Sequence, residues 1–142
     1  MNIGFVYALA AAISWGLVYA VDQKILSEVS PLVLLFINSA ITTILLVPYA
    51  FLHKNQLNET LLGSYTNWQN MLSAIILALV ANYCIFLSIK HLGSSYASMI
   101  EITYPFFVVL FSYVLFKSTP NIYFFIGSIF ICIGSIIILK AS

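Results

Sequence analysis

One acidic residue inside an apolar run is the feature of this sequence best suited to chemistry. Glu101 lies within Ser94–Phe116, which is otherwise apolar or only weakly polar. The run is long enough to cross a bilayer, because about 20 helical residues at about 1.5 Å each span a hydrocarbon core of about 30 Å. An ionisable side chain there costs at least about 2.5–3.5 kcal/mol. We therefore expect Glu101 to face the protein interior or water and to bind protons or substrate.

Pro105 modifies the backbone next to this acid. It lies four residues after Glu101 and has no backbone N–H, so the carbonyl of Glu101 loses its usual helical partner. Helical spacing places a small, polar set on roughly the same face, which is predicted to point into a helix bundle. This set comprises Ser94, Ala97, Ser98, Tyr104 and Ser112. The structural alternative for Glu101 is a neutral acid hydrogen-bonded to a hydroxyl group on a neighbouring helix.

The composition is that of an integral membrane protein. Of 142 residues, 63% are hydrophobic and 6% are charged, and the mean hydropathy is +1.09, whereas a soluble domain carries about 25% charged residues. Five lysines and no arginine leave no basic surface for nucleic acid. Cys84 and Cys132 lie in apolar runs without metal-ligand spacing, so we expect neither a metal nor another cofactor.

An enzymatic function is not expected. His53 and His91 lie at predicted membrane edges, and the sequence has no Ser/His/Asp arrangement or His-x-x-x-His pair. A single buried glutamate also lacks an evident partner for acid–base or metal chemistry.

Five apolar runs predict an all-α integral membrane fold with five transmembrane helices in a single domain, residues 1–142. Ser30-Pro31 and Thr119-Pro120 are helix-start signals, and Gly93 suits a helix C-terminus. The first run is interpreted as a retained span rather than a signal peptide, and the polar connection 53–67 as the one long loop. The predicted helices cover residues 3–21, 31–52, 68–89, 94–116 and 120–139.

The lysines give little orientation bias. Lys54 and Lys117 lie on the side of the amino terminus, and Lys24, Lys90 and Lys140 lie on the other side. Because cytoplasmic loops normally carry the excess of lysine and arginine, a nearly balanced chain is compatible with insertion both ways up. One orientation imposed by a weak signal is the equally weighted alternative.

Small residues recur on two of the predicted helices. Gly127 and Gly134 lie seven residues apart on the last helix, and the first helix carries a small residue at every fourth position. Such spacing lets helices approach closely, either within one subunit or between two subunits. The positions on the first helix, where packing within the subunit is favoured, are Ala8, Ala12, Gly16 and Ala20.

Several short motifs in the same order resemble an EamA-type domain of the drug/metabolite transporter superfamily. They are Ser14-Trp15-Gly16, Lys24, Ser30-Pro31, Tyr83, Ser88-Ile89-Lys90-His91-Leu92, Ala97-Ser98, Pro105 and the Gly127–Gly134 spacing. The resemblance covers essentially the whole chain and implies a transport function.

The chain departs from the family pattern at three places. Asn38 stands about where many members have an arginine, and Lys117-Ser118 stands where a glutamate is usual. The pattern also does not require an acid at position 101. The transport function is therefore carried over from the resemblance, and the substrate contacts are not.

The resemblance also implies that two five-helix units assemble to form the transporter. Most members contain two oppositely oriented five-helix units, so this chain corresponds to one half of a ten-helix inverted-repeat architecture. Transporter sites commonly lie between inverted repeats. We therefore expect a homodimer, with antiparallel subunits related by a two-fold axis in the membrane plane.

The resulting hypothesis is a proton-coupled exporter or antiporter working by alternating access in the cell membrane, which in a bacterium is the inner membrane. Protons and a small cationic or amphipathic metabolite or drug would compete for two copies of Glu101. Aromatic side chains would form walls and asparagines would donate directional hydrogen bonds; ordinary packing and interhelical bonding are the alternatives. These candidates are Trp15, Tyr19, Tyr83 and Tyr104, with Asn38 and Asn82.

Two other functions stay open from the sequence. The chain is alternatively a half-transporter or accessory membrane subunit that needs a different partner chain. It is alternatively a flippase for a lipid-linked or amphipathic metabolite, for which a cavity open sideways to lipid would be evidence.

Overall fold

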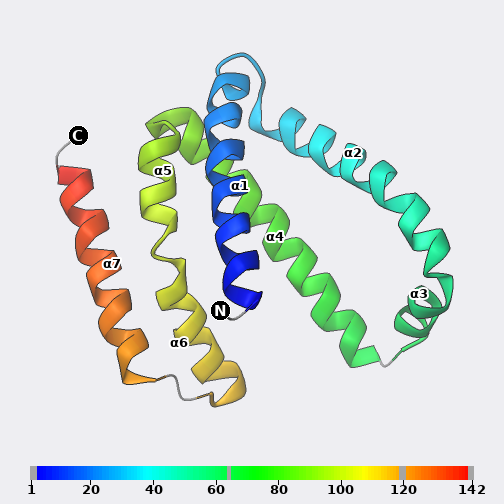
Figure 1. The fold of residues 1–142 in the computed structure, drawn as a ribbon. Coiled ribbons are helices and arrows are strands. Elements are labelled where there is room, and N and C mark those ends of the chain that lie inside the picture. Colours follow the sequence, from blue (N-terminus) through cyan, green and yellow to red (C-terminus); the bar gives the residue numbers. More distant parts are fainter. Residues whose placement is uncertain (1–2, 64, 119–120, 141–142) are drawn as a thin grey trace. The chain divides into compact units, whose positions relative to one another are not determined.

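The computed structural model describes residues 3–63, 65–118 and 121–140, and these are almost entirely helical. Within those residues no β-strand occurs. The chain divides into two compact units, Met1–Lys24 with Ser88–Ser142 and Ile25–Leu87. The helices, labelled in Figure 1, are α1 (Ile3–Leu26), α2 (Pro31–Leu52), α3 (Lys54–Leu61), α4 (Tyr65–Leu92), α5 (Ser94–Glu101), α6 (Tyr104–Phe116) and α7 (Ile122–Lys140).

Four helical segments are long and apolar enough to cross a membrane: Ile3–Leu26, Pro31–Leu52, Trp68–Leu92 and Ser94–Phe116. The apolar segment in α7, Ile122–Ile138, is shorter than the about 20 residues of a typical span. The all-helical membrane fold is thus confirmed, whereas a total of five spans stays a prediction.

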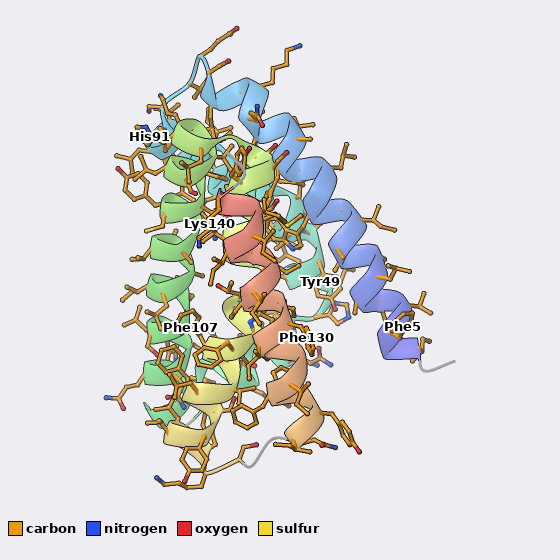
Figure 2. The ribbon with its side chains drawn as sticks, turned by 90° about the vertical axis from the view of Figure 1, so that its left-hand side faces the viewer. Phe5, Tyr49, His91, Phe107, Phe130 and Lys140 are labelled. Carbon is orange, nitrogen blue, oxygen red and sulfur yellow. The ribbon has the colours of Figure 1, made fainter. Side chains whose placement is uncertain are left out.

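The outer surfaces of these helices are apolar. Phe5 on α1, Phe107 on α6 and Phe130 on α7 are labelled in Figure 2, and their side chains are 61%, 49% and 70% exposed. In water such surfaces would be unfavourable, but in a bilayer they contact lipid tails that are equally apolar.

The unit that contains both ends of the chain is built from α1, α5, α6 and α7. In Figure 1 α7 lies beside α5 and α6. A hydrogen bond joins α7 to α5, because the Ser135 Oγ lies 2.7 Å from the carbonyl oxygen of Met99. This bond fixes the backbone of α5 two residues before Glu101.

The predicted helix 94–116 is interrupted in the structure. It ends as α5 at Glu101 and resumes as α6 at Tyr104. Pro105 cannot donate to the carbonyl of Glu101, and the N–H of Thr103 instead bonds to the carbonyl of Ile100, as does the Thr103 hydroxyl. This tighter turn separates the two helices and places the acid at the end of the first.

The unit Ile25–Leu87 contains α2, α3 and most of α4. The predicted start of α2 is confirmed, since the Ser30 hydroxyl accepts a hydrogen bond from the N–H of Val33 and Pro31 is the first helical residue. The prediction of a loop over 53–67 is wrong in part, because Lys54–Leu61 forms α3. The polar residues of that segment suggested a loop, but a short helix follows α2 after a single residue, His53.

Other predicted boundaries are shifted outward. α1 continues to Leu26 rather than ending at residue 21, and α4 covers Tyr65–Leu92 rather than 68–89. Polar residues in these extensions do not end the helices, because backbone hydrogen bonding continues through them. Gly93 follows α4 directly and its N–H bonds to the carbonyl of Ile89, which confirms the predicted helix end. The Thr119-Pro120 start signal lies outside the described residues.

Candidate functional site

The central contact of the site joins α1 to the end of α5. The Tyr19 hydroxyl donates a hydrogen bond to Oε2 of Glu101. Tyr19 is buried, with 8% of its side chain exposed, because it lies on the side of α1 that faces the rest of its unit. Two predicted site residues that are 82 positions apart are thus brought together. A hydroxyl on a neighbouring helix was also the structural alternative for Glu101, so this contact by itself leaves the role of the acid open.

Glu101 itself is exposed in the single chain, where the expectation was that it faces the protein interior or water. The polar face around it is only partly covered. Ala97 is buried and Ser94, Ser98 and Ser112 are half-buried, whereas Tyr104 is 60% exposed. The exposed residues of this polar face, Glu101 and Tyr104, therefore lie at the end of α5 and the start of α6.

Two further aromatic residues lie near the Tyr19–Glu101 contact. The Trp15 ring packs against the Tyr19 ring, with centroids 5.6 Å apart and planes tilted by 58°. Tyr104, at the start of α6, lies three positions after Glu101. The structure therefore brings together four of the predicted site residues: Trp15, Tyr19, Glu101 and Tyr104.

A second contact fixes α5 against α1. The Oε1 atom of Gln23 accepts hydrogen bonds from the N–H of Ser94, at 2.8 Å, and from its hydroxyl, at 2.6 Å. Ser94 is the first residue of α5, so Gln23 satisfies a backbone donor that has no partner within the helix. Together with Tyr19–Glu101, this contact ties both ends of α5 to α1.

Asp22 is an acidic residue of this region that the sequence analysis missed. It is buried, with 5% of its surface exposed, and its Oδ2 atom has no hydrogen-bond partner in the described structure. The predicted end of the first helix at residue 21 left Asp22 in a connection. The signal that would have found it is the helical spacing from Tyr19, because residues three positions apart lie on one face.

The other predicted site residues belong to the unit Ile25–Leu87. Asn38 on α2 is exposed, and Tyr83 on α4 is half-buried. The side-chain amide of Asn82 donates to the carbonyl of Ala78, one turn earlier on the same helix, at 2.8 Å. A role of these three residues in substrate binding stays a prediction.

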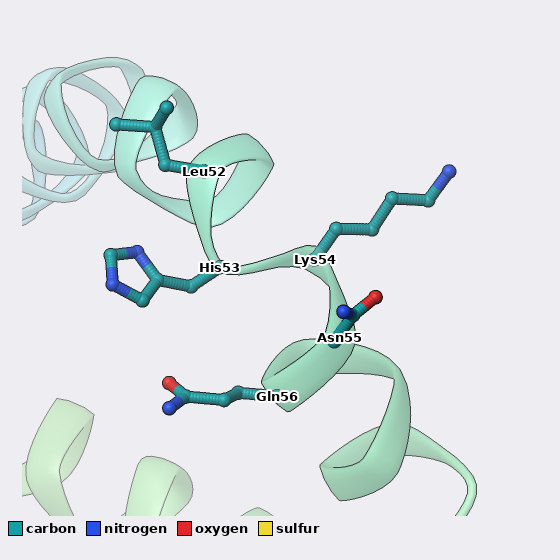
Figure 3. A pocket seen from close by; sticks show the side chains of 5 residues that line it. All are labelled: Leu52, His53, Lys54, Asn55 and Gln56. Carbon is teal, nitrogen blue, oxygen red and sulfur yellow. The ribbon is translucent and has the colours of Figure 1, made fainter.

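A depression of about 330 Å³ lies at the junction of α2 and α3 and is lined by Leu52, His53, Lys54, Asn55 and Gln56. Figure 3 shows His53 and Gln56 extending to one side of the chain and Lys54 to the other. His53 stacks on Tyr49, with ring centroids 4.1 Å apart. These local contacts account for the polar side chains there without a bound substrate.

The apolar helices define a multi-pass membrane protein, and the Tyr19–Glu101 contact places an acid at the interruption of one candidate span. The model of the EamA-like transporter family matches residues 2–140. The chain belongs to this family, as the sequence resemblance predicted, and the family is one of membrane transporters in the drug/metabolite superfamily. Neither the curated proteins nor the solved structures contain a significant match to the chain.

Proposed function

We propose that the protein is a proton-coupled exporter of small cationic or amphipathic molecules, in which Glu101 binds protons and substrate in exchange. The observation that carries this proposal is that Glu101 is hydrogen-bonded and yet exposed in the single chain. Tyr19 occupies one carboxyl oxygen, and the side chain remains exposed. An acid within a candidate membrane span is costly when it faces lipid, so it needs a ligand, water or protein around it.

The working form in this proposal is a homodimer with antiparallel subunits. A second copy would cover Glu101 and bring two acids to a shared cavity, where like charges favour binding of a proton or a cation. The surfaces available for such an assembly include the small-residue positions, because a Cβ atom built at Gly16, Gly127 or Gly134 meets no atom of the described residues within 4 Å. The nearly balanced lysines support insertion in both orientations.

The aromatic residues next to Glu101 suit this class of substrate. Trp15, which packs against Tyr19, and Tyr104, three positions after Glu101, are 52% and 60% exposed. Aromatic faces attract cations and also pack against flat apolar groups. A flat organic cation would therefore satisfy both the carboxylate and the rings.

The test is ethidium export from cells that express the chain, compared between wild type and Glu101→Gln. Glutamine keeps the approximate shape and removes the titration, so export driven by a proton gradient should be lost. Glu28→Gln is the matched control, because Glu28 is exposed and lies outside the candidate spans. Unchanged export by Glu101→Gln would refute the coupling role. Equal ethidium accumulation with and without the wild-type chain would refute export of this cation.

A further inference from the structure

Asp22 is a buried acid that the proposed role of Glu101 leaves unexplained. It is 5% exposed, and its Oδ2 atom accepts no hydrogen bond from any described residue. A carboxylate removed from water is unfavourable unless it is paired, hydrogen-bonded or neutralised. Oδ2 of Asp22 meets neither of the first two conditions in this structure, and a proton on the carboxyl group would meet the third.

The lysines of this unit do not supply the missing partner. Lys90 and Lys140 are exposed, and no described residue donates a hydrogen bond to Oδ2 of Asp22. The ionisable groups that act on the Tyr19 hydroxyl are acidic or phenolic. They are Asp22 on α1, Glu101 on α5 and Tyr104 on α6, and Glu101 also accepts the hydrogen bond of this hydroxyl.

Tyr19 connects Asp22 to Glu101. Asp22 follows Tyr19 by three positions on α1, so both buried side chains lie on the same face of that helix. The Tyr19 hydroxyl is bonded to Glu101, and it lies within electrostatic range of Asp22. Tyr19 is therefore the residue through which a change in the charge of one carboxyl would act on the other.

We propose that Asp22 is a second proton-binding carboxyl of the transport site, coupled to Glu101 through Tyr19. Two carboxyl groups that interact take up their protons in two linked steps. Each chain would then carry two exchangeable protons rather than one. This inference rests on the proposed function, and it extends the site of that function from one acid to two.

The test uses the full chain in liposomes and needs no known substrate. Asp22 is the only aspartate in the sequence, so synthesis with carboxyl-labelled aspartate marks this one side chain in the unaltered protein. The carbon-13 signal of that carboxyl is followed by solid-state nuclear magnetic resonance while the pH is varied. We expect the signal to move from the protonated to the charged position as the pH is raised.

Coupling is tested with the same label in two variants. Glu101→Gln removes one charge and Tyr19→Phe removes the bridging hydroxyl, so each should displace the midpoint of the Asp22 titration. Glu28→Gln, which alters an exposed acid, should leave the midpoint where it is. A purely structural aspartate would not show a titration midpoint that moves in Glu101→Gln and Tyr19→Phe but stays in place in Glu28→Gln.

Two results would overturn this inference. One is an Asp22 signal that keeps the same protonation state throughout the pH range. The other is a titration that is unaffected by Glu101→Gln and Tyr19→Phe. Failure of the proposed function is seen separately: ethidium export would be unchanged in Glu101→Gln, whereas the coupled titration of Asp22 would persist.

Discussion

The hydroxyl of Ser135 on α7 lies 2.7 Å from the carbonyl oxygen of Met99 on α5, and 3.0 Å from the carbonyl oxygen of Ile131 on its own helix. This single hydroxyl therefore connects two helices that contribute to the unit containing Glu101. Ser128 offers a natural comparison on the same helix. It is equally buried, at 5% exposure, but its hydroxyl bonds to Phe124 within α7.

Ser135→Ala should therefore destabilise the protein more than Ser128→Ala does. Interhelical hydrogen bonds in membrane proteins contribute about 0.6 kcal/mol on average and up to about 1.7 kcal/mol. We expect a difference of this size in the free energy of unfolding, measured by denaturant titration in detergent micelles. Equal losses in the two variants would show that the bond to Met99 adds no stability beyond the bond within α7.

Gly93→Ala should be destabilising because of the backbone, not because of crowding. Gly93 has φ +84° and ψ 159°, a conformation that residues other than glycine rarely adopt. A Cβ atom there would lie 3.7–3.9 Å from the side-chain amide of Gln23, which is an ordinary contact distance. We expect a loss of about 1–3 kcal/mol in the free energy of unfolding.

Crowding can be separated from backbone strain with a second substitution. Gln23→Ala removes the side chain that a new Cβ atom at position 93 would approach. If strain dominates, the cost of Gly93→Ala should be similar in the wild-type and Gln23→Ala backgrounds. A cost that disappears in the Gln23→Ala background would contradict the strain explanation.

Pro105→Ala should impair transport without destabilising the fold. Alanine restores an N–H that can bond to the carbonyl of Glu101, so α5 and α6 would join into one regular helix and the acid would be displaced from its place beside Tyr19. Ethidium export and the free energy of unfolding are measured on the same preparations. We expect export to fall about tenfold or more, as small misplacements at functional groups do, while stability stays equal or rises.

Pro48→Ala is the matched control for this prediction. Pro48 lies inside α2, which continues without interruption from Pro31 to Leu52. The substitution should raise helix stability there and leave export unchanged. Equal export by Pro105→Ala and wild type would show that the interruption after Glu101 is not needed for transport.

The antiparallel dimer predicts that the chain inserts in both orientations. A reporter fused after Lys140 should be active on both faces of the membrane. Adding lysines at the exposed positions Asn55 and Gln56 should shift the reporter to one face, because positive charge in short loops sets orientation. Activity on one face only in the wild-type chain would contradict the antiparallel assembly and favour a different partner chain.

Much of the helical architecture was predictable from the sequence, because long apolar runs in a bilayer can satisfy their backbone groups in only a few ways. The Ser30-Pro31 start and the Gly93 helix end were predictable for local reasons, since capping and positive φ depend on neighbouring residues. Family membership followed from the order of short motifs along the chain. The choice of Glu101 followed from the cost of an ionisable group within an apolar run.

Only the tertiary structure showed which residues meet at that acid. Tyr19 and Glu101 are 82 positions apart, and no periodicity within one helix determines how it is rotated against another. The interruption at Thr103 and the extension of α1 past Asp22 likewise depend on hydrogen bonds and on packing between helices. A buried carboxyl oxygen without a partner becomes visible only when its surroundings are known, and for Asp22 those surroundings are formed by the fold.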